Sequence, residues 1–318
     1  MSYPIAERPL WVPDCDRVAA ANMTAFARSA EGRWGRALPD YPALHAWSVN
    51  EPAEFWASIW ELGEVRGEMG SVVLENGHLM PGARWFPEAR LNFAENLLRS
   101  RDDSDAMVFW GEDRVKNRLS HGDLYRQVAH FAAALREMGV EPGDRVAAWM
   151  PNLPETIVVM LAAASIGAIF SSASPDFGVQ GVLDRFGQIE PKVLVCVDGY
   201  WYNGKPVDCL EKNAEVVARM PSLLRTVVVP YLDPAAGVGA VANAVSWRDL
   251  PTVAADAEVR ITRVAFDHPL FIMFSSGTTG VPKCIVHCHG GALLQHLKEH
   301  QLHSDVRPGD RLFYFTTC

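Results

Sequence analysis

The sequence has no excess of positive charge and no cysteine framework. Its 318 residues carry 29 Lys and Arg against 38 Asp and Glu, a formal charge of −9. An acidic chain is a poor partner for nucleic acid, because binding to a phosphate backbone needs a basic face. Its six cysteines are scattered singly, except that Cys284 and Cys288 lie close together; the others are Cys15, Cys196, Cys209 and Cys318. This spacing excludes a disulfide scaffold and favours a reducing, cytoplasmic setting.

Long hydrophobic runs and a secretory signal are also missing. The opening residues, MSYPIAERPL, contain no basic stretch followed by an apolar one. Residues 156–175 carry no charge, but their strongly apolar part ends near Phe170. That is short of the roughly 18 to 20 residues that cross a bilayer. The small residues within this stretch predict a buried helix followed by a short buried strand, so we expect a soluble protein without a membrane span.

The chain length suggests about two domains, and composition changes near residue 95. Residues 1–95 are rich in Trp, whereas 96–318 are not. In this Trp-rich N-terminal extension, NEPAEFWASIWELG has helical spacing of its aromatic residues, with Asn50 and Pro52 where a helix would begin and Gly63 where it would end. Large aromatics mostly serve as packing area. We therefore interpret them as anchors that dock this extension onto the main body, rather than as a ligand-stacking surface.

From about residue 106 the sequence alternates between strand and helix patterns. AMVFW, DRVAAWM, KVLVCVD, RTVVVP and PLFIMF are typical of strands. LSHGDLYRQVAHFAAALREMGV predicts a helix with Ser120 at its N-cap and Gly139 at its end, and PETIVVMLAAASIG predicts another. Such alternation predicts an α/β fold of layered, parallel-rich sheets with helices on both faces.

Two stretches match known nucleotide-binding patterns only weakly. Gly199–Pro206, GYWYNGKP, has the Gly and Lys spacing of a Walker phosphate loop. However, Pro206 replaces the Ser or Thr that follows the Lys, and three bulky rings fill the loop. The second, Gly237–Ala242, loosely resembles a dinucleotide fingerprint but lacks a strand leading directly into it. We expect neither to bind a nucleotide in the usual way.

A group of Cys284, His287, Cys288 and His289 suggests a metal site. Zinc sites usually combine two separated ligand pairs, and the sequence shows no second pair. Strand geometry would also send neighbouring side chains to opposite faces. We therefore expect ordinary packing here and assign no metal ligand.

The strongest signal is the loop Ser275-Ser276-Gly277-Thr278-Thr279-Gly280-Val281-Pro282-Lys283. A buried apolar strand, residues 271–274, leads into it. Glycines let backbone N–H groups turn inward around an anion, hydroxyls add donors, and Lys283 adds a point charge. Pro282 pushes the residue before it towards extended geometry, so we predict a strand, CIVH, after the loop instead of the helix that follows a Walker loop. A hairpin connection without a ligand remains the alternative.

At this loop the sequence resembles the adenylate-forming (acyl-CoA synthetase and luciferase-like) superfamily. The family's signature, Ser/Thr-Ser/Thr-Gly-Ser/Thr-Thr-Gly-x-Pro-Lys, fits residues 275–283 throughout. LSHGDLYRQV and LAAASIGAIFSSASPDFG resemble other family segments, and RWFPEARLNFAENLL resembles the lead-in of acetyl-CoA-type synthetases. Further segments, including NMTAFAR, DYPALHAWSV and GGALLQHLKEHQLH, resemble the branch of the family that activates acetoacetate.

The resemblance implies a ligase that converts acetoacetate and ATP to an acyl-adenylate and pyrophosphate, and then transfers the acyl group to CoA. It implies that Ser275, Ser276, Gly277, Thr278, Thr279, Gly280 and Lys283 hold the phosphates of MgATP. A loop placed like residues 198–205 contacts CoA in the acetyl-CoA synthetases, which implies a CoA contact for Lys205. The implied domains are an N-terminal extension, 1–95, and an AMP-binding domain, 96–318.

Three alternatives remain open. Acetate or propionate could replace acetoacetate as the acid, and an NTPase could use the same loop for hydrolysis. The resemblance also implies that this chain ends within the large domain and lacks the small C-terminal domain, the acyl pocket and the catalytic lysine. On that reading the chain alone is an inactive fragment, weakly stable because apolar surface is uncovered.

Overall fold

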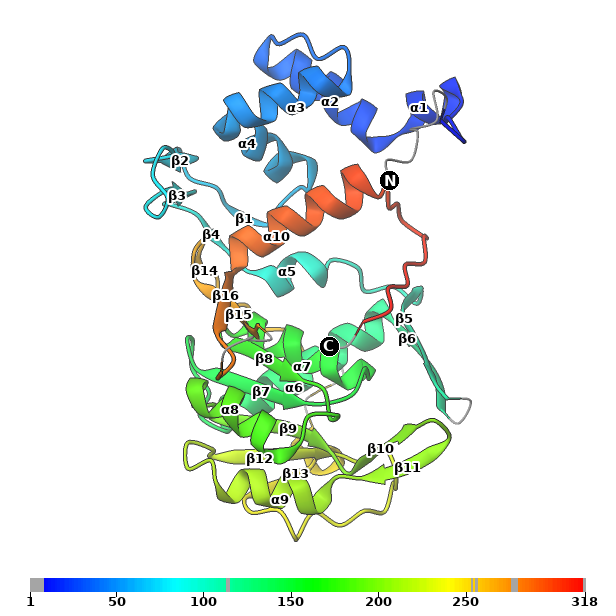
Figure 1. Ribbon diagram of the computed structural model, residues 1–318, viewed down its shortest axis with the longest axis vertical. Helices are drawn as coiled ribbons and strands as arrows, with labels where there is room; N and C mark the ends of the chain where they lie inside the picture. Colours follow the sequence, from blue (N-terminus) through cyan, green and yellow to red (C-terminus); the bar gives the residue numbers. More distant parts are fainter. Residues whose placement is uncertain (1–8, 113–114, 253, 255–256, 276–279, 317–318) are drawn as a thin grey trace, which may run out of the picture. The chain divides into compact units, whose positions relative to one another are not determined.

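The computed structural model describes residues 9–112, 115–252, 254, 257–275 and 280–316. By its internal contacts the chain divides into two compact units. The helical unit comprises the residues up to Val65 together with Leu293–Phe313, and the sheet unit comprises Arg66–Ala292 with the residues from Tyr314 onward (Figure 1). The elements that carry the candidate site lie in the sheet unit.

The helical unit is built from short helices, and α2, α3 and α4 bury aromatic side chains. They are α1 (Cys15–Ala20), α2 (Asn22–Trp34), α3 (Tyr41–Asn50), α4 (Pro52–Leu62), the end of α10 (His289–Leu297) and the π-helical η2 (Lys298–His303). The predicted helix over the FWASIWE stretch is confirmed as α4, with Gly63 as its C-cap. The prediction for Asn50 is wrong: it is the last residue of α3, and Glu51 is the N-cap of α4, because Pro52 lets a new helix begin at once.

Aromatic rings pack together in the core of this unit. The rings of Phe26, Trp47 and Phe55 lie with centroids 5.8 to 6.3 Å apart. Trp47 and Trp60 are about 95% buried, with exposed fractions of 5% and 6%. The Trp34 indole donates a hydrogen bond of 2.9 Å to the Ser58 hydroxyl. The tryptophans here supply buried area and fixed polar contacts.

A seven-stranded sheet organises the sheet unit, in the order β13-β12-β9-β7-β8-β15-β16. Its strands are β7 (Arg145–Trp149), β8 (Ile169–Ala173), β9 (Val193–Val197), β12 (Arg225–Val229), β13 (Ala244–Ser246), β15 (Pro269–Phe274) and β16 (Cys284–Cys288). Neighbouring strands run parallel except for β16, which pairs antiparallel with β15. The predicted parallel-rich sheet is confirmed.

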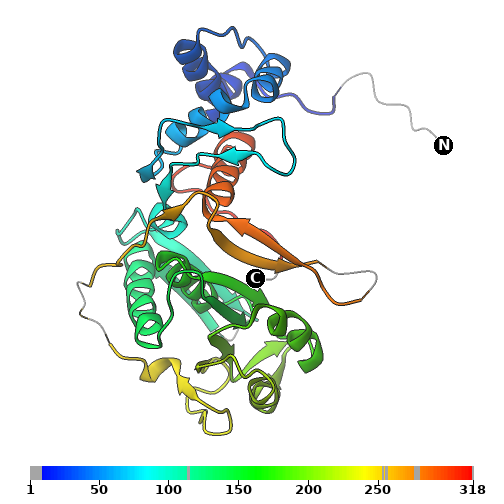
Figure 2. The same cartoon turned by 90° about the vertical axis from the view of Figure 1, so that its left-hand side faces the viewer.

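Helices cover both faces of this sheet (Figure 2). They are α6 (His121–Glu137), α7 (Pro154–Ser165), α8 (Val179–Ile189) and α9 (Leu210–Ala218). Phe186 of α8 and Val216 of α9 pack with Trp149 and Leu194 in one apolar cluster. Strand alternation directs Ala148 and its equivalents to the other face, where α7 contacts β7 and β8. The layered α/β architecture predicted from the sequence is therefore confirmed.

Local sequence signals explain where these helices begin and end. Ser120 and Asp123 form a reciprocal capping box at the start of α6, and Gly139 has a left-handed backbone, with φ of 79°, just after its end. The apolar stretch 156–175 is the buried α7 followed by β8, as predicted. No helix in the described ranges is both long enough and apolar enough to cross a membrane.

Smaller elements complete the unit. They are the sheet of β1 (Gly67–Glu68), β4 (Arg90–Leu91) and β14 (Val264–Ala265), the pairs β2 (Leu74–Glu75) with β3 (Arg84–Trp85), β5 (Asp105–Gly111) with β6 (Val115–Ser120) and β10 (Gly199–Tyr202) with β11 (Lys205–Asp208), and the helices α5 (Phe93–Leu97) and η1 (Trp247–Asp249). The strand predicted from AMVFW exists as β5. It pairs antiparallel with β6 in a hairpin of its own, outside the large sheet.

Candidate phosphate-binding site

The loop with the strongest sequence signal connects β15 to β16. These strands pair antiparallel up to Phe274 opposite Cys284. The Ser275 N–H donates to the Lys283 carbonyl oxygen at 3.0 Å, which closes the loop at its neck. Residues Ser276, Gly277, Thr278 and Thr279 lie outside the described residues. The predicted strand after Pro282 is confirmed, so this loop ends in a strand and not in a helix.

The two strands are far more exposed than the sequence suggested. Only Ile272 of the predicted buried run 271–274 is buried, and Met273 is 55% exposed. On β16, Ile285 is 45% and Val286 55% exposed. The prediction of a buried strand is therefore wrong, and the reason is position. β16 is the edge of the sheet, and the arm formed by β15 and β16 extends beyond its neighbour β8 (Figure 2).

Lys283 is a surface cation at the end of the loop. Its side chain is exposed, and nothing in the described part of the chain forms an ion pair or hydrogen bond with its ammonium group. Gly280, earlier in the loop, has a φ of 134°, which L side chains rarely adopt. Ser275 and Lys283 are thus brought together, and Lys283 keeps its charge available for an anion.

Gln188, in the last turn of α8, contacts the residues on both sides of Lys283. Its amide donates to the Pro282 carbonyl oxygen at 2.9 Å, and its carbonyl oxygen lies 3.8 Å from the Cys284 sulfur, at hydrogen-bond distance for a thiol. The sequence offered no motif for this residue. Its place at the polar end of an amphipathic helix is the only local signal, and that signal does not predict its partner.

The Cys and His residues after the loop contact different neighbours. Cys284 and His287 are exposed, and burial raises the pKa of the Cys288 thiol. His289 is fully buried, and its Nδ1 accepts the Phe93 N–H at 3.1 Å. Within the described ranges no three His, Cys, Asp or Glu side chains lie close enough together to hold a metal ion.

Lys205 lies in a different hairpin, formed by β10 and β11. Asn203 and Gly204 form its two-residue turn with φ of 50° and 74°, the backbone that Asn-Gly turns adopt. Lys205 is the first residue of β11, so a strand stands where a Walker loop would open a helix. Lys205 is exposed and belongs to a separate two-stranded sheet, so it does not share the loop of Ser275 and Lys283.

Carboxylates hold this second hairpin at three points. Asp198, 3% exposed, accepts the N–H groups of Gly199, Tyr231, Leu232 and Asp233 at 2.7 to 2.9 Å. Glu112 accepts the N–H groups of the turn residues, Asn203 at 2.8 Å and Gly204 at 2.7 Å. Asp176 accepts the Tyr200 hydroxyl at 3.0 Å; burial and this hydrogen bond raise the pKa of Tyr200 to about 12. The sequence did not reveal these braces.

A cavity of about 310 Å³ lies within the helical unit. Its walls include Phe26, Leu44, Phe55 and Trp56, with Lys298 at its edge. The Lys298 ammonium is paired with Glu299 at 3.0 Å. Because Glu299 neutralises Lys298, this cavity is a weaker candidate for binding an anion than the loop that ends at Lys283.

Two family models match the chain in succession. The model described as "Acetyl-coenzyme A synthetase N-terminus" matches residues 41–97. The model described as "AMP-binding enzyme" matches residues 93–318 and contains both hairpins described above. The resemblance drawn from residues 275–283 is confirmed.

Individual proteins are similar over nearly the whole chain. The acetoacetyl-coenzyme A synthetase of Rhizobium meliloti is 54% identical over 98% of this chain and 48% of its own length. The malonamoyl-CoA synthetase of Penicillium aethiopicum is 36% identical over 99% of this chain and 45% of its own length. The solved acetoacetyl-CoA synthetase from Streptomyces lividans matches with a TM-score of 0.92 and 43% identity, over 98% of this chain and 48% of that one. The chain thus spans about half the length of the relatives it matches.

Proposed function

Because the chain belongs to the AMP-binding enzyme family, we propose that this protein is an ATP-dependent ligase that joins acetoacetate to coenzyme A. In the first step a carboxylate oxygen attacks the α-phosphorus of ATP, which forms acetoacetyl-adenylate and releases pyrophosphate. In the second step the CoA thiol attacks the acyl carbon. Acetoacetyl-CoA forms, AMP leaves, and the thiol gives up its proton.

One observation carries the phosphate-binding part of this proposal: the hairpin loop is closed at its neck and presents the exposed ammonium of Lys283. Two anions must meet during adenylation, so positive charge has to lie where the phosphates lie. We assign the β- and γ-phosphates of ATP to residues 275–280 and Lys283. Because the loop runs into a strand, no helix N-terminus stands behind the phosphates. Side-chain hydroxyls and Lys283 then carry more of the binding, and pyrophosphate is held by groups that can release it.

CoA and magnesium enter the proposal on different grounds. We assign a CoA contact to Lys205, an exposed lysine on a braced hairpin. ATP is proposed to bind as its magnesium complex, which screens the phosphate charge. The described residues form no group of metal-ligating side chains, so no step here is attributed to a metal ligand of this chain. The thiols of Cys15, Cys196, Cys209, Cys284 and Cys288 are all free, which supports a reducing cytoplasm as the site of action.

The choice of acid rests on the relatives' names and needs a direct test. Acetoacetate and malonamate share a carbonyl group β to the carboxylate and differ in a methyl against an amino group. The test is pyrophosphate exchange into ATP with acetoacetate, malonamate, acetate, propionate or no acid, on this chain and on a version extended to its relatives' length. We expect exchange that depends on acetoacetate in the extended protein. Exchange with none of the acids in either protein would overturn the ligase proposal, and acid-independent release of phosphate would replace it with an NTPase.

A further inference from the structure

The arm that carries the phosphate loop has a buried fastening at its base. β15 starts at Pro269 and β16 ends at Cys288, so His268 and His289 flank the base of the arm. The His289 N–H donates to the His268 carbonyl oxygen at 3.0 Å, and the Gly290 N–H donates to the Phe266 carbonyl oxygen at 2.9 Å. A Cβ on Gly290 would lie 2.1 Å from the Phe266 ring, so the two chains approach closely here.

The His289 ring joins this base to the start of α5. The N-cap of α5 is Asn92, whose side-chain oxygen accepts the N–H groups of Ala94 at 2.9 Å and Glu95 at 3.3 Å. That leaves the N–H of Phe93, the first residue of the helix, which donates to His289 Nδ1. The N–H at the first position of α5 is therefore satisfied by a side chain 196 positions further along the chain.

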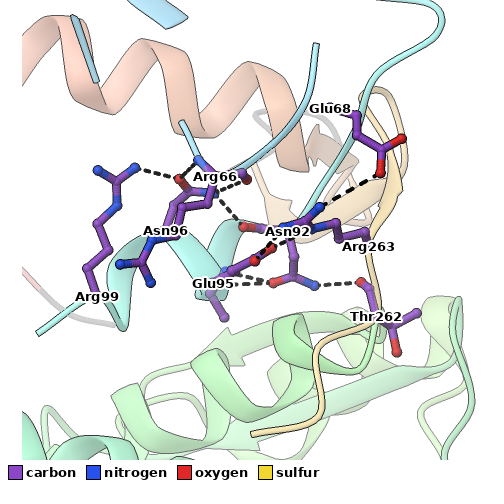
Figure 3. Close-up of polar contacts among 9 residues, drawn as sticks. Arg66, Glu68, Asn92, Glu95, Asn96, Arg99, Thr262 and Arg263 are labelled. Atoms are coloured by element: carbon purple, nitrogen blue, oxygen red, sulfur yellow. Dashed lines mark hydrogen bonds and ion pairs between the residues drawn. The ribbon is translucent and has the colours of Figure 1, made fainter. Parts of the chain in front are cut away.

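Asn92 ties the same point to two further segments. Its amide donates to the Ala164 carbonyl oxygen at 2.7 Å and to the Thr262 carbonyl oxygen at 2.8 Å, the latter drawn in Figure 3. Arg263 beside Thr262 forms an ion pair with Glu95 of α5 at 2.8 Å. α5 is thus a fixed point for His289 to bind.

The chemistry of this contact defines the form of the imidazole. A backbone N–H can only donate, so His289 Nδ1 has no proton and the ring is neutral with its hydrogen on Nε2. Burial, together with the neighbouring His268, lowers the pKa of His289 to about 3, which keeps the ring in this form at neutral pH. No partner for Nε2 is present among the described groups. Among the described groups the ring is therefore hydrogen-bonded at Nδ1 alone, to Phe93, and the His268 ring packs beside it with a centroid distance of 5.7 Å.

A small tilt at the base of the arm produces a large displacement of the loop at its end. Six residues of β15 span roughly 20 Å at the usual rise of a strand, so a tilt of about 5° moves the loop by nearly 2 Å. Displacements of about 1 Å from the productive geometry can slow catalysis roughly a hundredfold. The arm is also held by the pairing of β15 with β8 and by the ring contact of Phe271 with Phe93, whose centroids lie 5.6 Å apart. Further contacts are the Ser171 hydroxyl on the Ile272 carbonyl oxygen at 2.7 Å, and Gln188 at the exposed far end.

We propose that His289 is a positioning residue for the phosphate loop: its ring fixes the base of the β15–β16 arm to α5 and so sets where Lys283 lies. The role of Lys283 rests on the proposed function, whereas the fastening itself does not. His289 touches no substrate in this scheme; it acts through the arm.

The test compares His289→Asn with His289→Leu in this chain, by hydrogen exchange of the amides in residues 271–274 and 284–287. Asn and Leu have the same shape, but only Asn offers an oxygen where Nδ1 stood. We expect exchange in the arm to accelerate about tenfold or more in His289→Leu, because a buried N–H loses its acceptor. His289→Asn should stay near the wild-type rate, and β7 and β9 should be unchanged in both. Equal rates in the two variants, or acceleration spread evenly over the sheet unit, would overturn the proposal.

A second measurement does not depend on a variant that folds. Nitrogen NMR of the wild-type imidazole should show the proton on Nε2 and no titration between pH 5 and 8. A proton on Nδ1 would contradict the contact with Phe93. In the extended protein, His289→Leu should slow pyrophosphate exchange at least tenfold and His289→Asn less than threefold. If the extended wild-type protein shows no pyrophosphate exchange, the proposed function fails. The contact between His289 and Phe93 is still tested by hydrogen exchange and NMR.

Discussion

Two hairpins of the sheet unit both contain Gly and Lys in a phosphate-loop pattern, yet they are built differently. In β10–β11 the turn residues Asn203 and Gly204 already donate their N–H groups to the Glu112 carboxylate. In β15–β16 the loop is longer, and the ammonium group of Lys283 at its end has no partner within the part of the chain that is described. Backbone N–H groups that converge on one point bind anions. In the first hairpin a side chain of the protein already supplies that anion.

The comparison teaches that glycine and lysine spacing alone does not make a phosphate site. What matters is whether the donors are still available once the chain has folded. In the sheet unit, acidic side chains consume the donors of one hairpin, while the other is held at its base by a neutral histidine. The predictions below test this difference, beginning with the largest expected effect.

The two lysines should differ sharply in adenylation. Lys283→Ala removes the positive charge proposed to face the phosphates, and we expect acetoacetate-dependent pyrophosphate exchange to fall about 10²- to 10³-fold in the extended protein. Lys205→Ala should change it less than about twofold, because Lys205 is assigned to the second step. Lys212→Ala, an exposed lysine on α9, is the matched control. Equal losses at Lys205 and Lys283 would remove the distinction between the hairpins.

The carboxylate at the base of β10–β11 should matter for stability. Asp198→Ala removes an acceptor from four N–H groups, of which that of Tyr231 also donates to the Val229 carbonyl oxygen, in a site where Asp198 is 3% exposed. We expect the free energy of unfolding to drop by roughly 2 to 4 kcal/mol, measured by urea denaturation. Asp249→Ala, an exposed aspartate of the same unit, should cost no more than about 0.5 kcal/mol. A similar small cost for Asp198→Ala would show that the brace is not needed.

The stability that His289 contributes at the base of β15–β16 should depend on pH. The pKa of His289 is about 3 in the folded protein against an ordinary 6.5, owing to burial and the nearby His268. The unfolded chain therefore takes up this proton first, so stability is full above about pH 6.5 and is lost as the pH falls towards 3. This group should contribute a slope of about 1.4 kcal/mol per pH unit in that window. The free energy of unfolding, measured for wild type and His289→Asn between pH 7 and 5, isolates this contribution. The same pH dependence in both proteins would contradict the assignment.

The smallest effect is expected at the tip of β10–β11. Glu112→Gln keeps the size of the side chain but weakens its grip on the turn, because a charged acceptor is replaced by a neutral one. Hydrogen exchange at Asn203 and Gly204 should accelerate by less than about tenfold, and the core strand β9 should not change. Slower exchange at the turn would mean that the carboxylate does not hold it.

Local patterns allowed much of this fold to be predicted. Ser120, Asp123 and Gly139 define the ends of α6 because capping depends on neighbouring residues. The strand after Lys283 followed from Pro282 for the same reason. Continuous apolar runs identified β7, β9 and β12, because both faces of a parallel sheet are covered; the short edge strand β13 was not predicted.

Features set by distant parts of the chain were not predictable. The exposure of Met273 and Val286 depends on β16 being a sheet edge, which no local pattern encodes. In the sequence His289 lies in a Cys and His cluster, and its partner Phe93 comes 196 residues earlier. The grip of Gln188 on Pro282, and of Glu112 on the β10–β11 turn, arises in the same way from tertiary proximity. Asn92 before Phe93-Ala-Glu was the one available signal, since Asn is a favoured N-cap.

The most direct test of the account is to find which lysine lies at the ATP phosphates. An ATP analogue with an acyl group on its γ-phosphate transfers that group to a nearby amine, and peptide mapping then identifies the labelled lysine. We expect that Lys283 is labelled, that excess ATP prevents the labelling, and that Lys205 is not labelled. Labelling of Lys205 in place of Lys283, or labelling of Lys283 that ATP does not reduce, would show that the β15–β16 loop does not hold the nucleotide.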